Sequence, residues 1–277
     1  MRSELLAKQP WLAHGFSTRV GGYSNAYGKG ELNLGFNDED DRKNVDRNRE
    51  LFMHELSGGK NGSWEVTNLR QIHSDVIYRV DDPAKKLAPG DGMITRAPRV
   101  LLAIRTADCL PILIADPEHK AAGAFHAGWR GTLTRIAEKG VGAMRREFGS
   151  NATKLIAAIG PGIHVCCYSV GAEVREQFES QFDYAAELFR EVHDVDAVRK
   201  KYPLMFMNQR APGHGNTGPE LHLDLVEANR RQLLAAGLRA ENIEASELCT
   251  ACRTDLLFSH RAEHGKTGRM FGAIGIV

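Results

Sequence analysis

The chain of 277 residues is long enough to bury a sizeable hydrophobic core, as one large domain or two ordinary ones. Apolar residues make up 42% and charged residues 26%, the usual balance of a globular protein. The formal net charge of +1 gives no electrostatic reason to expect nucleic acid or a membrane as partner, so a small-molecule substrate is the default.

Targeting signals and cysteine usage indicate where the protein works. The N-terminal residues show no charged start followed by an apolar run and a cleavage site, and no apolar run approaches membrane-spanning length. Five cysteines are an odd number in a large chain, which does not suggest a disulfide scaffold. We therefore expect a cytoplasmic, reduced protein, either a monomer or a homodimer.

The first part of the chain, to about residue 65, is rich in loops and glycine. A turn at Gly21 and Gly22 ends a short strand, and the polar segment 41–56 with sparse apolar residues is typical of a surface helix.

The middle and C-terminal parts are more regular. Short apolar runs predict strands, and apolar residues at three-to-four spacing predict helices. The expected strands are 100–104, 112–115, 121–125, 155–159 and 268–277, and the expected helices are 132–148, one after Gly171, and 224–236 with Gly237 as its stop. Strands and helices do not alternate strictly. We expect an α/β (α+β) fold, one domain over residues 1–277 with a mixed sheet between helical layers.

Three short stretches each hold one residue that binds soft or borderline metals. His73 lies just before an apolar run, Cys109 lies in the loop between two predicted strands, and His126 lies at the end of a third. Two imidazoles and one thiolate are what zinc takes when a fourth position stays open for water or substrate. The spacing alone is not a regular zinc motif, so a buried cysteine with two hydrogen-bonded histidines remains the alternative.

Asp108 stands beside the cysteine. A carboxylate between two apolar strands needs a partner if it is buried. Asp108 can orient a ligating imidazole, act as an acid or base, or simply cap a turn. The CxxC pair Cys249 and Cys252 has no second such pair in the sequence, which favours ordinary thiols.

An ordered series of motifs resembles one known family. The matching stretches are 17–24 (STRVGGYS), 32–35 (LNLG), 71–73 (QIH), 90–92 (GDG), 106–111 (TADCLP), 126–131 (HAGWRG), 159–161 (IGP), 167–171 (CYSVG), 223–225 (LDL) with Ala228 and Asn229, 249–250 (CT) and 267–270 (TGRM). This series resembles the laccase-domain family, also called YfiH-like or multicopper polyphenol oxidoreductase, whose bacterial members are called purine nucleoside phosphorylase or peptidoglycan editing factor.

The resemblance implies a fold, a metal site and a substrate class. It implies a single three-layer α/β/α domain and a metal, zinc with copper as an alternative, held by His73, Cys109 and His126. It also implies phosphorolysis of adenosine, inosine and methylthioadenosine, together with deamination of adenosine. Arg19 and Asn33 match the family's substrate-pocket residues. The chain departs from the family at Ser74, Gly162 and His260, which leaves the three ligand positions unchanged.

The residue types suit these reactions. Zinc with three protein ligands activates water near neutral pH, as zinc deaminases require, and Asp108 is the nearest residue in sequence for moving the proton. Phosphorolysis needs phosphate held against the ribose, a role for Arg19 or Arg130. Multicopper oxidation needs many histidines in His-x-His pairs. The chain has 11 histidines and no such pair, although a His, His and Cys site can hold Cu(I).

Two other functions remain open. In a cysteine hydrolase acting on peptidoglycan precursors, Cys109 is the nucleophile, His126 the base and Asp108 the orienting group. In a non-catalytic protein the metal is structural, and then all four coordination positions come from the protein.

Overall fold

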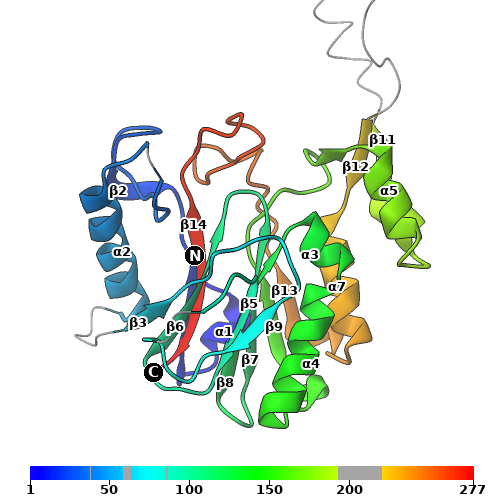
Figure 1. Cartoon of the computed structure of the whole chain (residues 1–277), viewed down its shortest axis with the longest axis horizontal. Helices are drawn as coiled ribbons and strands as arrows, with labels where there is room; N and C mark the ends of the chain where they lie inside the picture. The colour runs from blue at the N-terminus through cyan, green and yellow to red at the C-terminus, as the bar shows by residue number, and fades with distance from the viewer. Residues whose placement is uncertain (38, 59–63, 85–86, 193–219) are drawn as a thin grey trace, which may run out of the picture. The chain divides into compact units, whose positions relative to one another are not determined.

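The computed structural model describes residues 1–37, 39–58, 64–84, 87–192 and 220–277 (Figure 1). The chain divides into two compact units, one formed by Met1–His164 with Leu225–Val277 and the other by Val165–Asp224. A single domain over residues 1–277 stays a prediction. In the described part of the chain, no helix has the length and apolar character needed to cross a membrane.

The first unit contains a four-stranded mixed sheet and the helix that covers it. The strand order is β1 (Leu12–Phe16), β14 (Met270–Ile276), β6 (Val100–Thr106) and β3 (Glu65–Thr67), with only the β3–β6 pair parallel. Helix α2 (Arg42–Leu56) starts at Asp41, whose side chain caps it, and its Phe52 and Leu56 pack against Phe271 and Ala273 of β14. The surface helix expected over 41–56 is confirmed. Short elements α1 (Glu4–Ala7) and β2 (Val20–Ser24) complete this region.

A second, six-stranded mixed sheet carries His126 in one strand, and Cys109 and His73 lie just before two others. Its order is β13 (Ile243–Ala245), β9 (Ile156–Ile159), β7 (Leu110–Asp116), β8 (Ala121–Ala127), β5 (Gly92–Thr95) and β4 (Ile77–Arg79). The edge pairs β13–β9 and β4–β5 are parallel and the inner pairs are antiparallel. All residues of β7 and β8 are buried, as their unbroken apolar runs predicted.

The two sheets of the first unit share one hydrophobic core. Leu102 and Ile274 from the four-stranded sheet lie in one buried cluster with Leu113, Ala124 and Ala158 from the six-stranded sheet. Figure 1 shows α2 on the outer side of the first sheet and α4 and α7 on the outer side of the second. The α/β class is confirmed. The first unit has two sheets where the sequence indicated one, because an apolar run predicts a strand but not which sheet it joins.

The helix expected over 132–148 is two helices, α3 (Trp129–Leu133) and α4 (Ile136–Phe148). Arg135 has a left-handed backbone with φ 66°, which breaks the helix between them. The side chain of Asn229 and that of Gln232, both on α7 (Leu225–Ala235), donate hydrogen bonds to Thr132 and hold α3 in place. The apolar period continues across the break, so the sequence pattern cannot reveal it.

The second unit has a small antiparallel sheet in the order β10 (Ser169–Val170), β12 (Glu220–Leu223) and β11 (Phe189–Val192). Helix α5 (Ala172–Glu179) starts after Gly171, as expected, and its Phe178 packs against Phe182 and Phe189. The remaining helical turns among the described residues are η1 (Ala152–Lys154), η2 (Ala185–Leu188) and η3 (Ala240–Asn242).

Candidate metal centre

Three different loops and strands of the first unit supply the predicted ligands. His73 is exposed in the loop before β4 and has a left-handed backbone with φ 60°. Cys109 is half-buried in the turn between β6 and β7. His126 is buried near the end of β8, where it pairs with Pro111 of β7. Sheet pairing therefore brings together Cys109 and His126, which are 17 residues apart in sequence.

The three side chains converge. The Sγ atom of Cys109 and one ring nitrogen of each histidine all lie within 4.8 Å of one another. The Cys109 Sγ to His73 Nε2 distance is 3.9 Å, and the two imidazole rings meet edge to face with centroids 4.9 Å apart. Thiolate and imidazole ligands at this spacing match a zinc site that keeps a fourth position open.

Gly128 shows that the backbone is shaped around this group. A Cβ atom at residue 128 would lie 2.9 Å from Cys109 Sγ and 2.9 Å from the Cδ2 atom of His73. Both neighbours are side chains of the trio, so any larger residue would push them out of place. The glycine that precedes α3 therefore lets the chain pass closely behind the ligands, and the residues fit a bound metal.

Asp91 is the buried carboxylate that meets the trio. Its side chain accepts a hydrogen bond of 2.8 Å from His126 Nδ1, which leaves Nε2 of that ring for a metal. The same carboxylate accepts hydrogen bonds from the backbone of the loop that carries His73. Burial opposes ionisation of Asp91, but hydrogen bonds from His126 and Ser74 hold its pKa below the ordinary value.

The pKa values of Cys109 and His126 are shifted in opposite directions, towards a thiolate and an imidazolium. Burial works against a charged thiolate, but His126 and His73 outweigh it and lower the pKa of Cys109 to about 6. Burial likewise disfavours a protonated His126, yet the charges of Cys109 and Asp91 raise its pKa to about 9. A thiolate is ready to bind a metal or to attack an electrophile near neutral pH.

Asp108 holds the turn next to the cysteine. Its carboxylate accepts hydrogen bonds from Thr250 Oγ1 at 2.6 Å, Ser259 Oγ at 2.7 Å and the backbone N–H of Arg261 at 2.6 Å. Its backbone is left-handed, with φ 93°. These three donors secure the turn, whereas Asp91 occupies the imidazole-orienting position that the sequence analysis considered for Asp108.

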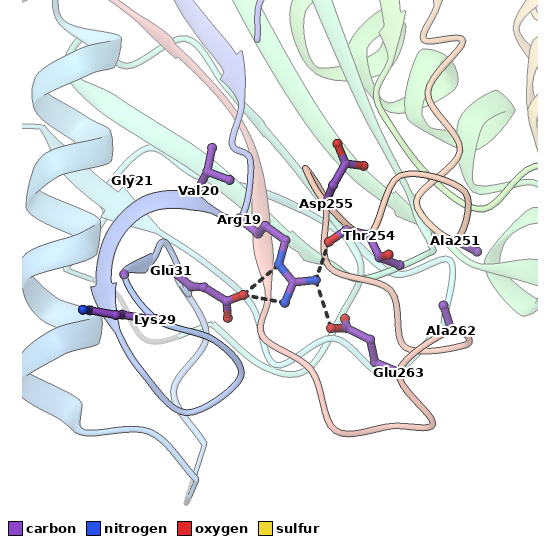
Figure 2. A pocket seen from close by; sticks show the side chains of 11 residues that line it. Arg19, Val20, Gly21, Lys29, Glu31, Ala251, Thr254, Asp255, Ala262 and Glu263 are labelled. Carbon is purple, nitrogen blue, oxygen red and sulfur yellow. Dashed lines mark hydrogen bonds and ion pairs between the residues drawn. The ribbon is translucent and has the colours of Figure 1, made fainter.

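Arg19 is buried among protein partners beside a cavity of about 640 Å³ (Figure 2). Its guanidinium pairs with Glu31 and with Glu263, donates to the Thr254 carbonyl, and lies 4.6 Å from the ring centroid of Phe258. Glu263 also accepts a hydrogen bond from the Ser259 backbone. Arg19 therefore supports the segment whose Ser259 holds Asp108, and its substrate role stays a prediction.

Asn33 and Arg130 differ in how far they are exposed to solvent. Asn33 is fully buried, and its amide bonds Gly35, Asp40 and the backbone of Arg269. Arg130 is exposed on α3, with its guanidinium 4.3 Å from the ring centroid of Trp129. Of the three polar residues predicted to bind substrate, Arg130 is the exposed one. Its position two residues after Gly128 favours it for an anion.

Asp91 was not among the predicted site residues, although its GDG stretch carried part of the resemblance. A carboxylate flanked by two glycines just before a strand is a weak sequence signal. Its partners are 15 to 35 residues away in the chain, and only the β5–β8 pairing, with Gly92 opposite Phe125, brings Asp91 next to His126.

Comparison with known proteins shows to which family the chain belongs. Residues 13–277 match the family described as Multi-copper polyphenol oxidoreductase laccase. The chain belongs to this family. A purine nucleoside phosphorylase of Bacteroides thetaiotaomicron is 32% identical over 280 residues, covering 99% of this chain and 94% of that protein. Adenosine deaminase RL5, from an unknown prokaryotic organism, is 34% identical over 214 residues, covering 74% of this chain and 72% of that protein.

A solved structure from the same family has the same fold. The crystal structure of the Bacillus licheniformis hypothetical protein YfiH matches with a TM-score of 0.80 and 32% sequence identity, covering 96% of this chain and 93% of that chain. That protein therefore shares its fold with this chain over nearly the whole length of the chain.

We predict that Gly128→Ala weakens zinc binding without unfolding the protein. The added methyl group meets Cys109 and His73, so zinc affinity should fall by at least roughly tenfold, in line with displaced ligands. Gly142→Ala is the matched control, because its Cβ meets nothing within 4 Å inside α4. Competition with a chromophoric chelator measures both variants, and equal affinity for the two would contradict the prediction.

Zinc binding should also release a proton. At a pH between the pKa of Cys109, about 6, and that of His126, about 9, Cys109 is deprotonated and the His126 ring holds its second proton. Zinc takes a neutral imidazole, so near pH ~8 each zinc should release about one proton and the apparent affinity should rise about tenfold per pH unit. Titration with a pH indicator in weak buffer measures this. No release at that pH would show that His126 is already neutral.

Proposed function

We propose that this protein is a metal-dependent purine nucleoside phosphorylase. Its substrates are adenosine, inosine and methylthioadenosine, and it also deaminates adenosine. Zinc is the proposed metal, held by His73, Cys109 and His126. The names of the relatives support the substrate class.

One observation carries the proposal: two imidazoles and a thiol with ligand atoms within 4.8 Å of one another. Three protein ligands are too few to close a tetrahedral zinc site, so the arrangement favours a catalytic over a structural metal at this trio. A trinuclear copper cluster needs more ligands than these three side chains offer. The family's oxidase description therefore fits this centre less well than a hydrolytic or phosphorolytic reaction.

The residues around the metal centre have different roles in the proposed reaction. When bound, zinc supplies Lewis-acid chemistry that makes water nucleophilic near neutral pH. Asp91 keeps the His126 ring oriented through Nδ1, and Asp108 keeps the Cys109 turn in place through its three donors. His73 is exposed and Cys109 half-buried, so substrate approaches the trio from the side of the loop before β4.

Phosphate binding falls to Arg130 in this proposal. Phosphorolysis forms a bond from phosphate oxygen to C1′ of the ribose while the bond from C1′ to the purine breaks. An exposed guanidinium two residues after Gly128, whose backbone passes close to the trio, can hold the phosphate for that attack, and its stacking on Trp129 limits its freedom. Arg19 is less suited, because Glu31 and Glu263 already neutralise it.

We predict phosphate-dependent release of hypoxanthine from inosine and of adenine from adenosine by the zinc-loaded protein. Cys109→Ala and His73→Ala should each lose at least about a hundredfold in kcat/KM, because each removes one of three ligands. His119→Ala is the matched control, since that half-exposed histidine pairs with Asp116 and not with the trio. Product release should follow phosphate concentration. Intact nucleosides after incubation with metal-loaded wild type would refute the proposal.

A second function is favoured by one observation. The lowered pKa of Cys109 and the raised pKa of His126 describe a thiolate and an imidazolium in contact, as in cysteine hydrolases. Asp91 bonds His126 Nδ1 and so takes the orienting place that the sequence analysis gave to Asp108. The alternative is thus a cysteine-type amide hydrolase editing peptidoglycan precursors, with Cys109, His126 and Asp91 as nucleophile, base and orienting group.

Thiol alkylation and metal removal separate the two functions. A hydrolase of this kind should lose activity on a peptidoglycan-precursor amide when iodoacetamide alkylates Cys109, and should keep it after treatment with a chelator. A phosphorylase should lose nucleoside cleavage after chelation and recover it when zinc is returned. Bound zinc should also slow alkylation of Cys109 by at least about tenfold if the thiolate is a ligand. Amide hydrolysis that requires zinc would exclude the cysteine mechanism.

A further inference from the structure

Asp91 is held in place by hydrogen bonds of its backbone as well as of its side chain. It lies directly before β5, fully buried, between Gly90 and Gly92. Its backbone N–H donates to the Val76 carbonyl at 3.0 Å, and its own carbonyl accepts from the His126 N–H at 2.8 Å. The backbone of Asp91 is therefore joined both to the chain beyond His73 and to the strand that carries His126.

The two carboxylate oxygens of Asp91 serve different donors. Oδ1 accepts from His126 Nδ1 at 2.8 Å and from the backbone N–H of His73 at 3.0 Å. Oδ2 accepts from the backbone N–H of Ile72 at 3.2 Å, and from the N–H and the hydroxyl of Ser74, both at 2.7 Å. Five donors thus point at one carboxylate, and they come from both histidine-bearing segments.

We propose that Asp91 is the positioning residue that presents both imidazoles of the metal centre at once. On the His126 side it fixes the ring orientation and keeps the proton on Nδ1, so that Nε2 faces the trio. On the other side, three consecutive N–H groups hold the loop in which His73 has its left-handed backbone. The inference rests on the proposed metal site and assigns a role in it to a residue outside the three ligands.

A carboxylate is needed here because an amide cannot satisfy both sides. Asparagine has the same shape but only one acceptor oxygen. If that oxygen faces His126, the NH₂ group meets the donors of Ile72 and Ser74. If the oxygen faces Ser74, the NH₂ group meets His126 Nδ1, which then must give up its proton to Nε2 and lose its metal-binding face. Either orientation displaces one of the two histidines.

The experiment compares Asp91→Asn with Asp116→Asn as a matched control. Asp116 is also fully buried and also bonds a histidine Nδ1, that of His119 at 2.8 Å, together with two backbone N–H groups. Zinc affinity, measured on the metal-free proteins by chelator competition, should fall about tenfold to a hundredfold in Asp91→Asn. Asp116→Asn should keep the wild-type affinity. An unchanged affinity in Asp91→Asn, or an equal loss in both variants, would overturn the inference.

A second readout needs no metal. In NMR spectra of the metal-free wild type, the Nδ1 proton of His126 and the amide protons of His73 and Ser74 should exchange slowly with solvent. In Asp91→Asn at least one of these two groups should lose its protection, while the amides of β7 keep theirs. Retained protection of both groups would contradict the argument from the single acceptor oxygen.

Ser74→Ala provides a variant that keeps the carboxylate and removes one of the five donors. Its zinc affinity should fall by about threefold, less than in Asp91→Asn, because four donors remain. In the double variant that combines Asp91→Asn with Ser74→Ala, the fold-loss of zinc affinity should be smaller than the product of the two single fold-losses, since both changes act on one group of contacts. Independent losses would overturn the inference. A wild type that binds no zinc would instead refute the proposed function, and the NMR comparison would still decide the role of Asp91.

Discussion

The metal centre depends on one buried carboxylate that accepts more hydrogen bonds than an amide of the same shape could accept. Asp91 accepts hydrogen bonds from His126 and from the loop that carries His73, and it is fully buried. A buried charge is costly unless it is paired and hydrogen-bonded, and here every bond that stabilises the charge also positions part of the trio. The stability of the carboxylate and the geometry of the two imidazoles therefore depend on the same set of contacts.

Cys109 is held in a comparable way through its neighbour Asp108. Asp108 has a left-handed backbone, and three donors from the segment 250–261 stabilise its carboxylate. That segment is itself tied to the N-terminal region through Glu263 and Arg19, whose guanidinium is paired on both sides. Residues far apart in the sequence thus share one support.

The chemistry of the trio follows from this support. With its pKa lowered to about 6, Cys109 is a thiolate near neutral pH, beside an imidazolium whose pKa is raised to about 9. A thiolate and two oriented imidazoles with one side exposed can hold a single borderline metal that keeps an open position. The same pair without metal is the arrangement of a thiol nucleophile, so the occupant of the centre, and not its shape, separates the two proposed functions.

The sequence by itself determined the α/β class, the main buried strands, the extents of α2 and α7 and the types of the three ligand residues. These features depend on local apolar patterns and side-chain chemistry, which residues close together in the sequence determine. Only the tertiary structure decided that the strands of the first unit form two sheets, that α3 and α4 separate at Arg135, and that Asp91, rather than Asp108, bonds His126. Each of these depends on strand pairing or on hydrogen bonds between distant segments. A carboxylate's partners are set by the register of β5 on β8, and the pattern of a single strand does not contain that register.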